Sequence, residues 1–170
     1  MIISINGALG SGKTLMLTYL AYSYYKAGYA IYSNYHLNFK YEPINVKETF
    51  DYSNCFIAFD ELHTFFDSRQ STKKSNRIFS YFILQTRKRN VVLGYTSQLH
   101  GAVDKRVRVV EDFNIFCEKK SEGIMYYITD GIKAKTLFLP NSKIPLIGKL
   151  YDTNQIIQPI EWYHKYLTIP

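Results

Sequence analysis

The chain has 170 residues, a formal net charge of +7 and 46% hydrophobic residues. These values are typical of one globular domain with a single core, and they exclude a disordered or collagen-like chain. The opening residues show neither a signal-peptide pattern nor an apolar run long enough to span a bilayer. We therefore expect a single cytoplasmic domain over residues 1–170, without a membrane anchor.

Strands and helices are predicted to alternate along the first two thirds of the chain. A strand over Met1–Asn6 leads through the loop Gly7–Thr14 into a helix over Leu15–Lys26, which Gly28 ends. Residues 35–50 combine turn residues with one candidate short helix. Further strands are expected at Ala30–Ser33, Cys55–Phe59, Val91–Thr96 and Val109–Phe116, and helical segments at Ser75–Lys88 and Asp104–Arg108.

The periodicity of the apolar residues changes after residue 123. Ile124–Thr129 and Ile132–Leu139 flank Asp130-Gly131, a pair typical of a two-residue type I′ turn, and this predicts an antiparallel hairpin over residues 124–139. The tail, residues 140–170, contains four of the five prolines and is expected to form loops and short pieces. The fold class predicted is therefore α/β, with a core over residues 1–116 built on a mainly parallel sheet flanked by helices.

Positive charge is concentrated in one part of the chain. The window from Asp67 to Arg108 contains ten basic residues, including all six arginines, against two acidic ones. Guanidinium groups bind phosphate oxygens well, so the window indicates recognition of a nucleotide or a nucleic-acid backbone. A solvated basic face of a helix is the alternative.

Cysteine and histidine give no sign of a metal site. Cys55 and Cys117 are 62 residues apart without a CxxC partner, and buried free thiols are the expected state. The four histidines show no ligand spacing.

A phosphate-binding loop is predicted directly after the first strand. Its segment fits the pattern GxxxxGK[ST] and opens a predicted helix, which is the context that this motif requires. Backbone N–H groups of the glycine-rich loop and the helix N-terminus would bind phosphates, Lys13 would neutralise the β and γ oxygens, and Thr14 would bind Mg²⁺. A glycine-rich turn without nucleotide is the alternative. The loop residues are Gly7, Ala8, Leu9, Gly10, Ser11, Gly12, Lys13 and Thr14.

Two adjacent acids end the predicted strand Cys55–Phe59. Asp60 is expected to bind Mg²⁺, and Glu61 is the candidate base that deprotonates the attacking water beside the γ-phosphate. Alternatively, the two acids are a helix N-cap and a first-turn residue.

Polar residues also end the strand that starts at Val91. Gln98 would lie at the carboxyl edge of a parallel sheet, beside the nucleotide, unless it belongs to a surface turn. Upstream, Arg87-Lys88-Arg89 ends the preceding helix, where basic residues also complement the helix dipole.

Together, GALGSGKTL, YYKAGYAIYSNYHL, FIAFDELHTFFDSR, TRKRNVVLGYTSQ and VDKRVR resemble the FtsK and HerA superfamily of DNA-translocating ATPases. Within it, the chain is similar to the zonular-occludens-toxin-like ATPases of filamentous phages and to genome-packaging ATPases of viruses and plasmids. The resemblance covers about residues 1–115, and Tyr151–Thr153 is similar to a segment that recurs near the end of such domains.

The resemblance implies a RecA-like P-loop fold and an ATP-hydrolysing, Mg²⁺-dependent motor that moves DNA. It further implies Gln98 as the polar sensor, and Arg87 or Arg89 as an arginine finger that acts on a neighbouring subunit. The partners implied are non-specifically bound DNA, expected to be double-stranded, a homo-oligomeric ring, usually a hexamer, and viral structural proteins. Filamentous-phage members usually carry a membrane anchor and a further domain, neither of which we expect here.

Two other function classes use the same motifs. A nucleoside or nucleotide kinase combines a phosphate loop with an Asp-Glu pair, but its base lies near an acceptor hydroxyl. The cysteine sets of zinc-binding thymidine kinases are absent from this sequence. A nucleotide-dependent switch or scaffold with negligible turnover is the third hypothesis.

Overall fold

The computed structural model describes residues 1–45, 51–62, 81–98, 101, 103 and 105–155. Its strands are β1 (Ile2–Gly7), β2 (Ala30–Ser33), β3 (Glu42–Pro43), β4 (Cys55–Phe59), β5 (Val91–Ser97), β6 (Phe113–Lys119), β7 (Gly123–Thr129) and β8 (Ala134–Pro140). Its helices are α1 (Lys13–Lys26), η4 (Thr86–Arg89), α3 (Lys105–Arg108), η6 (Asn141–Lys143) and α4 (Ile144–Gly148). Residues 81–85 are α-helical and lead into η4.

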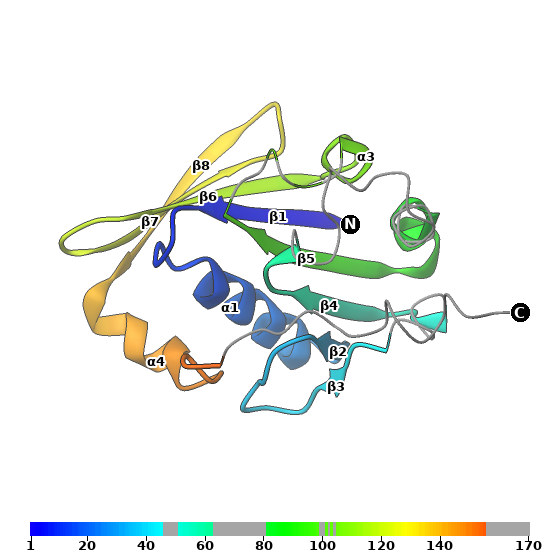
Figure 1. Ribbon diagram of the computed structural model, residues 1–170, viewed down its shortest axis with the longest axis horizontal. Helices are drawn as coiled ribbons and strands as arrows, with labels where there is room; N and C mark the ends of the chain where they lie inside the picture. Colours follow the sequence, from blue (N-terminus) through cyan, green and yellow to red (C-terminus); the bar gives the residue numbers. More distant parts are fainter. Residues whose placement is uncertain (46–50, 63–80, 99–100, 102, 104, 156–170) are drawn as a thin grey trace, which may run out of the picture.

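The strands form one eight-stranded sheet in the order β3-β2-β4-β5-β1-β6-β7-β8 (Figure 1). Neighbours from β3 to β6 pair in parallel, whereas β6, β7 and β8 pair antiparallel. The predicted α/β fold with a mainly parallel sheet and a C-terminal antiparallel hairpin is therefore confirmed. Because β5 lies between β1 and β4, the carboxyl ends of these three strands meet at one edge of the sheet.

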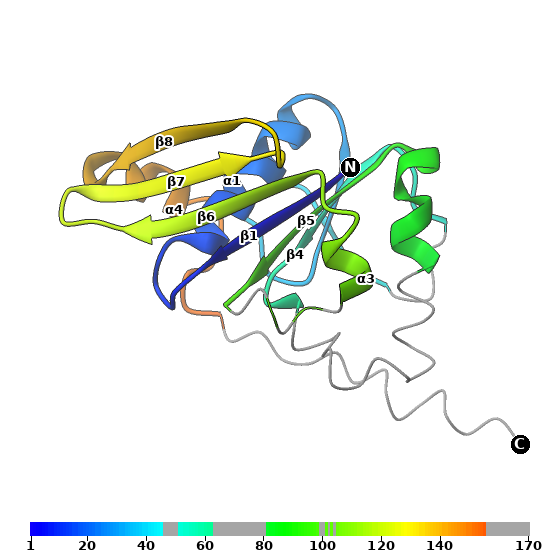
Figure 2. The same ribbon diagram turned by 90° about the horizontal axis from the view of Figure 1, so that it is seen from above.

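Helices cover both faces of the parallel part of the sheet. α1 packs on one face, and the helix that contains residues 81–85 lies with α3 on the other, as the two views show (Figures 1 and 2). Successive residues of a strand point to opposite faces, so Ile2 joins the core beneath α3 while Ile3 joins the core beneath α1. Buried apolar runs such as Cys55–Phe59 supply both cores.

The hairpin differs in detail from the sequence prediction. Four residues, 130–133, connect β7 to β8, and Asp130 does not have the positive φ of a type I′ turn, although Gly131 does (φ 87°). The Asp130 carboxylate instead accepts hydrogen bonds from the backbone N–H groups of Ile132 and Lys133 at 2.9 and 2.7 Å. The two-residue turn prediction is wrong because this side chain stabilises a longer loop.

Two other predicted elements also differ from the structure. β6 starts at Phe113 rather than Val109, because α3 runs into a turn over residues 109–110. No helix occurs in residues 35–45, where the two-residue strand β3 pairs with β2 instead. Part of the predicted helix Ser75–Lys88 lies outside the described residues.

Cys55 and Cys117 are both buried and free, as expected. No helix in the described part of the chain is long and apolar enough to cross a membrane.

Candidate nucleotide site

The glycine-rich segment forms a loop between β1 and the start of α1, as the motif predicts. Gly12, the residue before α1, has φ 90°, and Gly10 has φ 70°. At Gly7 (φ 149°), an added Cβ atom would lie 2.5 Å from the Cys117 carbonyl oxygen of the adjacent strand. Glycine is therefore required here both for backbone conformation and for close approach.

Lys13 and Ser11 carry polar groups inside this loop. The Lys13 Nζ atom donates to the Ala8 carbonyl oxygen at 2.9 Å, and only 5% of the residue is exposed. The buried Ser11 hydroxyl has no hydrogen-bond partner among the described residues. Both groups thus point within the loop, where a bound phosphate would offer them oxygen acceptors.

Asp60 follows β4 and meets residues from three other segments. The Thr14 hydroxyl donates to both carboxylate oxygens, at 3.2 and 3.1 Å, and the Thr96 hydroxyl donates to Oδ1 at 2.6 Å. The Asn34 side chain holds the backbone of Asp60, accepting from its N–H at 2.7 Å and donating to its carbonyl oxygen at 2.9 Å. The two residues predicted to bind Mg²⁺, Thr14 and Asp60, are therefore brought together.

The Asp60 carboxyl is buried at a position where its ionised form is costly. Only 4% of the residue is exposed, and burial raises its pKa to about 6. Hydrogen bonds from Thr96 and Thr14, and the charge of Lys13, lower the pKa, while the charge of Glu61 raises it. A divalent cation beside Asp60 would favour the ionised form.

Glu61 is held in an unusual backbone conformation. Its φ is 55°, in the left-handed region that few non-glycine residues adopt, and its N–H donates to the Thr96 hydroxyl at 2.8 Å. Thr96 thereby links both acids to the end of β5. Gln98 donates from Nε2 to Glu61 Oε1 at 3.4 Å, so the structure brings these two predicted catalytic residues together.

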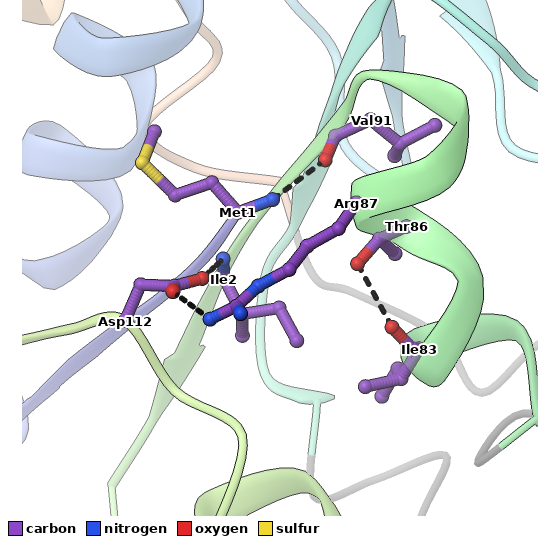
Figure 3. A network of polar contacts seen from close by, with 7 residues as sticks. All are labelled: Met1, Ile2, Ile83, Thr86, Arg87, Val91 and Asp112. Carbon is purple, nitrogen blue, oxygen red and sulfur yellow. Dashed lines mark hydrogen bonds and ion pairs between the residues drawn. The ribbon is translucent and has the colours of Figure 1, made fainter.

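Arg87 and Arg89 lie elsewhere. Figure 3 shows Arg87 paired with Asp112, whose other carboxylate oxygen accepts the Ile2 N–H at 2.8 Å. Ile2 begins β1, whereas the phosphate-binding loop follows its end, so Arg87 lies at the opposite edge of the sheet from Lys13. The Arg87 side chain is 74% exposed, and Arg89 donates to Gln85 Oε1 at 3.5 Å. The structure does not bring either arginine to the loop of its own chain.

Sequence reasoning missed three residues of this site. Asn34 and Thr96 orient the two acids, and the Tyr126 hydroxyl donates to the Gly12 carbonyl oxygen at 3.4 Å. Thr96 lies two residues before Gln98 in a polar strand end, a signal that was available. Asn34 and Tyr126 reach the site only through the order of strands in the sheet, which the local pattern does not reveal.

Comparison with solved structures agrees with this architecture. The chain is similar to the N-terminal domain of zonular occludens toxin from Neisseria meningitidis, with a TM-score of 0.67 and 14% identity over 89% of this chain and 98% of that one. It is also similar to the genome packaging NTPase B204 from Sulfolobus turreted icosahedral virus 2 in complex with ATP-gammaS, with a TM-score of 0.62 and 12% identity over 82% and 97% of the two chains. A third solved structure, an ATPase domain, matches with a TM-score of 0.57 and 8% identity over 88% and 84% of the two chains. No family model matches the sequence, and no curated protein does.

The fold is that of a P-loop NTPase. In this P-loop fold, the loop Gly7–Thr14 and the ends of β4 and β5 converge at one edge of the sheet. The hydroxyl of Thr14 and the carboxylate of Asp60 are hard oxygen ligands of the kind that Mg²⁺ prefers, so the donor set fits this ion. Within the described residues, no group of three or more His, Cys, Asp and Glu side chains is placed to hold a metal ion.

Proposed function

We propose that this chain is a Mg²⁺-dependent ATPase that moves DNA during genome packaging, virion assembly or DNA transfer in the cytoplasm. The observation that carries the proposal is the contact of Thr14 with Asp60, next to Lys13 and with Glu61 beside it. The similarity to B204, named a genome packaging NTPase and solved with ATP-gammaS, supports ATP as the substrate and packaging as the process.

The loop residues would bind the triphosphate. The Lys13 ammonium exchanges the Ala8 carbonyl for β and γ oxygens, and the unpartnered Ser11 hydroxyl gains an acceptor. Thr14 and Asp60 would hold Mg²⁺, which would supply positive charge to neutralise the phosphates. A hydroxyl has one hydrogen and two lone pairs, so Thr14 can donate to Asp60 and still offer a lone pair to the ion.

Glu61 is the proposed general base. Its carboxylate lies next to Asp60 and accepts from Gln98, an arrangement suited to orienting and deprotonating a water that attacks the γ-phosphate. The Thr96 hydroxyl holds the Glu61 backbone in place. Gln98 is the proposed sensor, because its amide contacts the proposed base and would bond the attacking water or the γ-phosphate.

The basic residues on the face opposite α1 are the proposed DNA surface. In the described part of the chain they belong to η4 and α3, which lie on the same face (Figure 2), and they are Arg87, Lys88, Arg89, Lys105, Arg106 and Arg108. The basic residues at 69, 73, 74 and 77 lie outside the described residues. If each subunit contacts about four phosphates, a plot of log affinity against log salt concentration should have a slope of about −3.6, whatever the sequence of the DNA.

A homo-oligomeric ring, expected to be a hexamer, is the proposed working form. The exposure of Arg87 at the edge away from its own loop supports a finger that serves a neighbouring subunit, with Arg89 as the second candidate. Viral structural proteins are the further partners proposed.

The rate of ATP hydrolysis, measured with and without duplex DNA and with Mg²⁺, tests this function. We expect a basal rate that duplex DNA raises several-fold. Phosphate transfer to an added nucleoside would instead indicate a kinase. Nucleotide binding without turnover under either condition would indicate a switch and would contradict the proposal.

A further inference from the structure

A cavity of about 350 Å³ lies between α1, the β7–β8 hairpin and α4. α1 and α4 lie on the same side of the sheet and contact each other (Figure 1). The walls are mostly apolar and include Leu15, Met16, Tyr126, Leu137, Lys143 and Leu146. A volume of this order and an apolar lining with few polar groups are typical of small-molecule sites.

The cavity adjoins the phosphate-binding loop. Leu15 directly follows Thr14 in the first turn of α1. Tyr126, which is 1% exposed, lines the cavity and also donates its hydroxyl hydrogen to the Gly12 carbonyl oxygen. Ile124 of the same strand packs on the loop so closely that a Cβ atom on Gly12 would lie 2.5 Å from its Cδ1 atom. A molecule in the cavity therefore shares a wall with a molecule bound in the loop.

The order of the strands gives a direction to a bound nucleotide. Asp60, Glu61 and Gln98 come from the ends of β4 and β5, which lie on one side of β1. In the proposed function, Asp60 holds the Mg²⁺ ion and Glu61 and Gln98 face the water that attacks the γ-phosphate. The γ-phosphate then lies on their side of β1, and the nucleoside end extends from the loop toward the other side. β6, β7 and β8 lie on that side, and β7 and β8 form part of the cavity wall.

We propose that this cavity binds the adenine base of the nucleotide. The inference rests on the proposed function, which places the triphosphate in the loop. The exposed apolar side chains of Leu137, Phe138 and Leu146 would cover the faces of the base. Lys143, the one charged residue of the described lining, is a hydrogen-bond donor, and no carboxylate belongs to that lining. This donor suits the ring nitrogens of adenine. Guanine also offers acceptors, N7 and O6, but its N1–H and N2–H donors would meet a described lining that contains no carboxylate.

Binding of ATP and of inorganic tripolyphosphate, which lacks the base and the ribose, tests the proposal. Leu146 is 64% exposed, so Leu146→Ala should leave the fold intact. We expect Leu146→Ala and Lys143→Ala each to weaken ATP binding about three- to tenfold, because apolar contact or a donor is lost. Binding of Mg²⁺-tripolyphosphate should stay within about twofold of the wild type.

Lys149→Ala is the matched control for Lys143→Ala. Lys149 is an exposed lysine at the end of α4 that does not line the cavity, and its replacement changes the net charge equally. Its Kd for both compounds should equal that of the wild type. If both lysine variants weaken both compounds alike, the effect is one of overall charge and the base site is wrong.

Photolabelling with 8-azidoadenosine triphosphate gives a second test that needs no variant. The label should appear, by mass spectrometry of peptides, in residues 15–19 or 137–147, and excess ATP should prevent it. Labelling confined to other peptides, or an unchanged ATP affinity in Leu146→Ala, would overturn the base site while leaving the phosphate site in place. If the wild type binds neither ATP nor tripolyphosphate, the proposed function fails, and the base site fails with it.

Discussion

At the residue scale, the Asp60 carboxylate combines burial with a position suited to Mg²⁺. Burial raises its pKa to about 6, above the ordinary value of 3.8. The Asp60 carboxyl therefore loses its proton at a lower pH in the unfolded chain than in the folded chain. Ionised Asp60 thus destabilises the metal-free fold, and this cost grows as pH rises from about 4 to about 6 and stays constant above.

Replacing Asp60 with Asn should stabilise the metal-free protein. Removing a buried charge whose pKa is raised by about two units corresponds to about 3 kcal/mol at pH 8, and to about half of that at pH 5. Denaturant unfolding of the metal-free protein at both pH values measures the gain. The exposed Asp51→Asn is the control and should change the free energy of unfolding little. A gain that is absent, or that does not shrink at pH 5, would show that the buried charge is not the cause.

Residues of the loop and the two acids were predictable because each follows a recognisable strand. The motif places Lys13 and Thr14, and the apolar run Cys55–Phe59 places Asp60 and Glu61. The positive φ of Glu61 and its anchor on Thr96 were not predictable, since they depend on the pairing of β4 with β5.

At the element scale, α1 approaches the sheet closely over Gly94 of β5. A Cβ atom at Gly94 would lie 2.8 Å from Leu17 Cδ1 and 2.8 Å from Phe56 Cζ, and both side chains are fully buried. Neither has room to move in a packed core. The position therefore sets how near α1, and with it the phosphate-binding loop, lies to the strand ends.

Gly94→Ala should lower the free energy of unfolding by about 1–3 kcal/mol, the usual cost of adding a methyl group to a filled core. Urea unfolding curves measure this loss. Gly148→Ala is the matched control, because a Cβ atom there meets nothing within 4 Å and φ is not positive. Equal stability of the two variants would contradict the close packing of α1 on β5.

Long apolar strands were predictable at this scale. The short strand β3 and the loop between β7 and β8 were not. β1, β4 and β5 are buried throughout and have a clear pattern. The two-residue strand β3 exists only because β2 offers a parallel edge, so no local pattern reveals it. Similarly, the Asp130 side chain, not the Asp-Gly pair alone, determines the loop between β7 and β8.

At the scale of the whole molecule, the two candidate fingers and the loop lie at opposite edges of the sheet. An arginine finger that stabilises charge on the γ-phosphate raises the turnover rate by a factor of about 10³ to 10⁵. Arg87 would do so only in a neighbouring subunit. Specific activity should then rise with protein concentration as rings form. The order of strands that separates Arg87 from Lys13 was not evident from local pattern.

Mixing inactive variants tests the finger. Lys13→Ala lacks a working loop and Arg87→Ala lacks the finger, so mixed rings pair an intact loop with an intact finger and should regain ATPase activity. The same mixture with Arg89→Ala distinguishes the two arginines. Lys149→Ala should be active alone. No rescue with either arginine variant, together with concentration-independent activity, would mean that no finger acts between subunits.

In the proposed reaction, Lys13 binds the triphosphate while Glu61 activates the attacking water. ATP binding and hydrolysis measured side by side for the wild type, Lys13→Ala and Glu61→Gln test it most directly. The wild type should bind and hydrolyse Mg²⁺-ATP, and Lys13→Ala should lose binding or turnover. Glu61→Gln should bind with nearly unchanged affinity and lose hydrolysis, because it loses the proton acceptor and keeps the groups that hold phosphate. Turnover of Glu61→Gln near the wild-type rate would show that Glu61 is not the base.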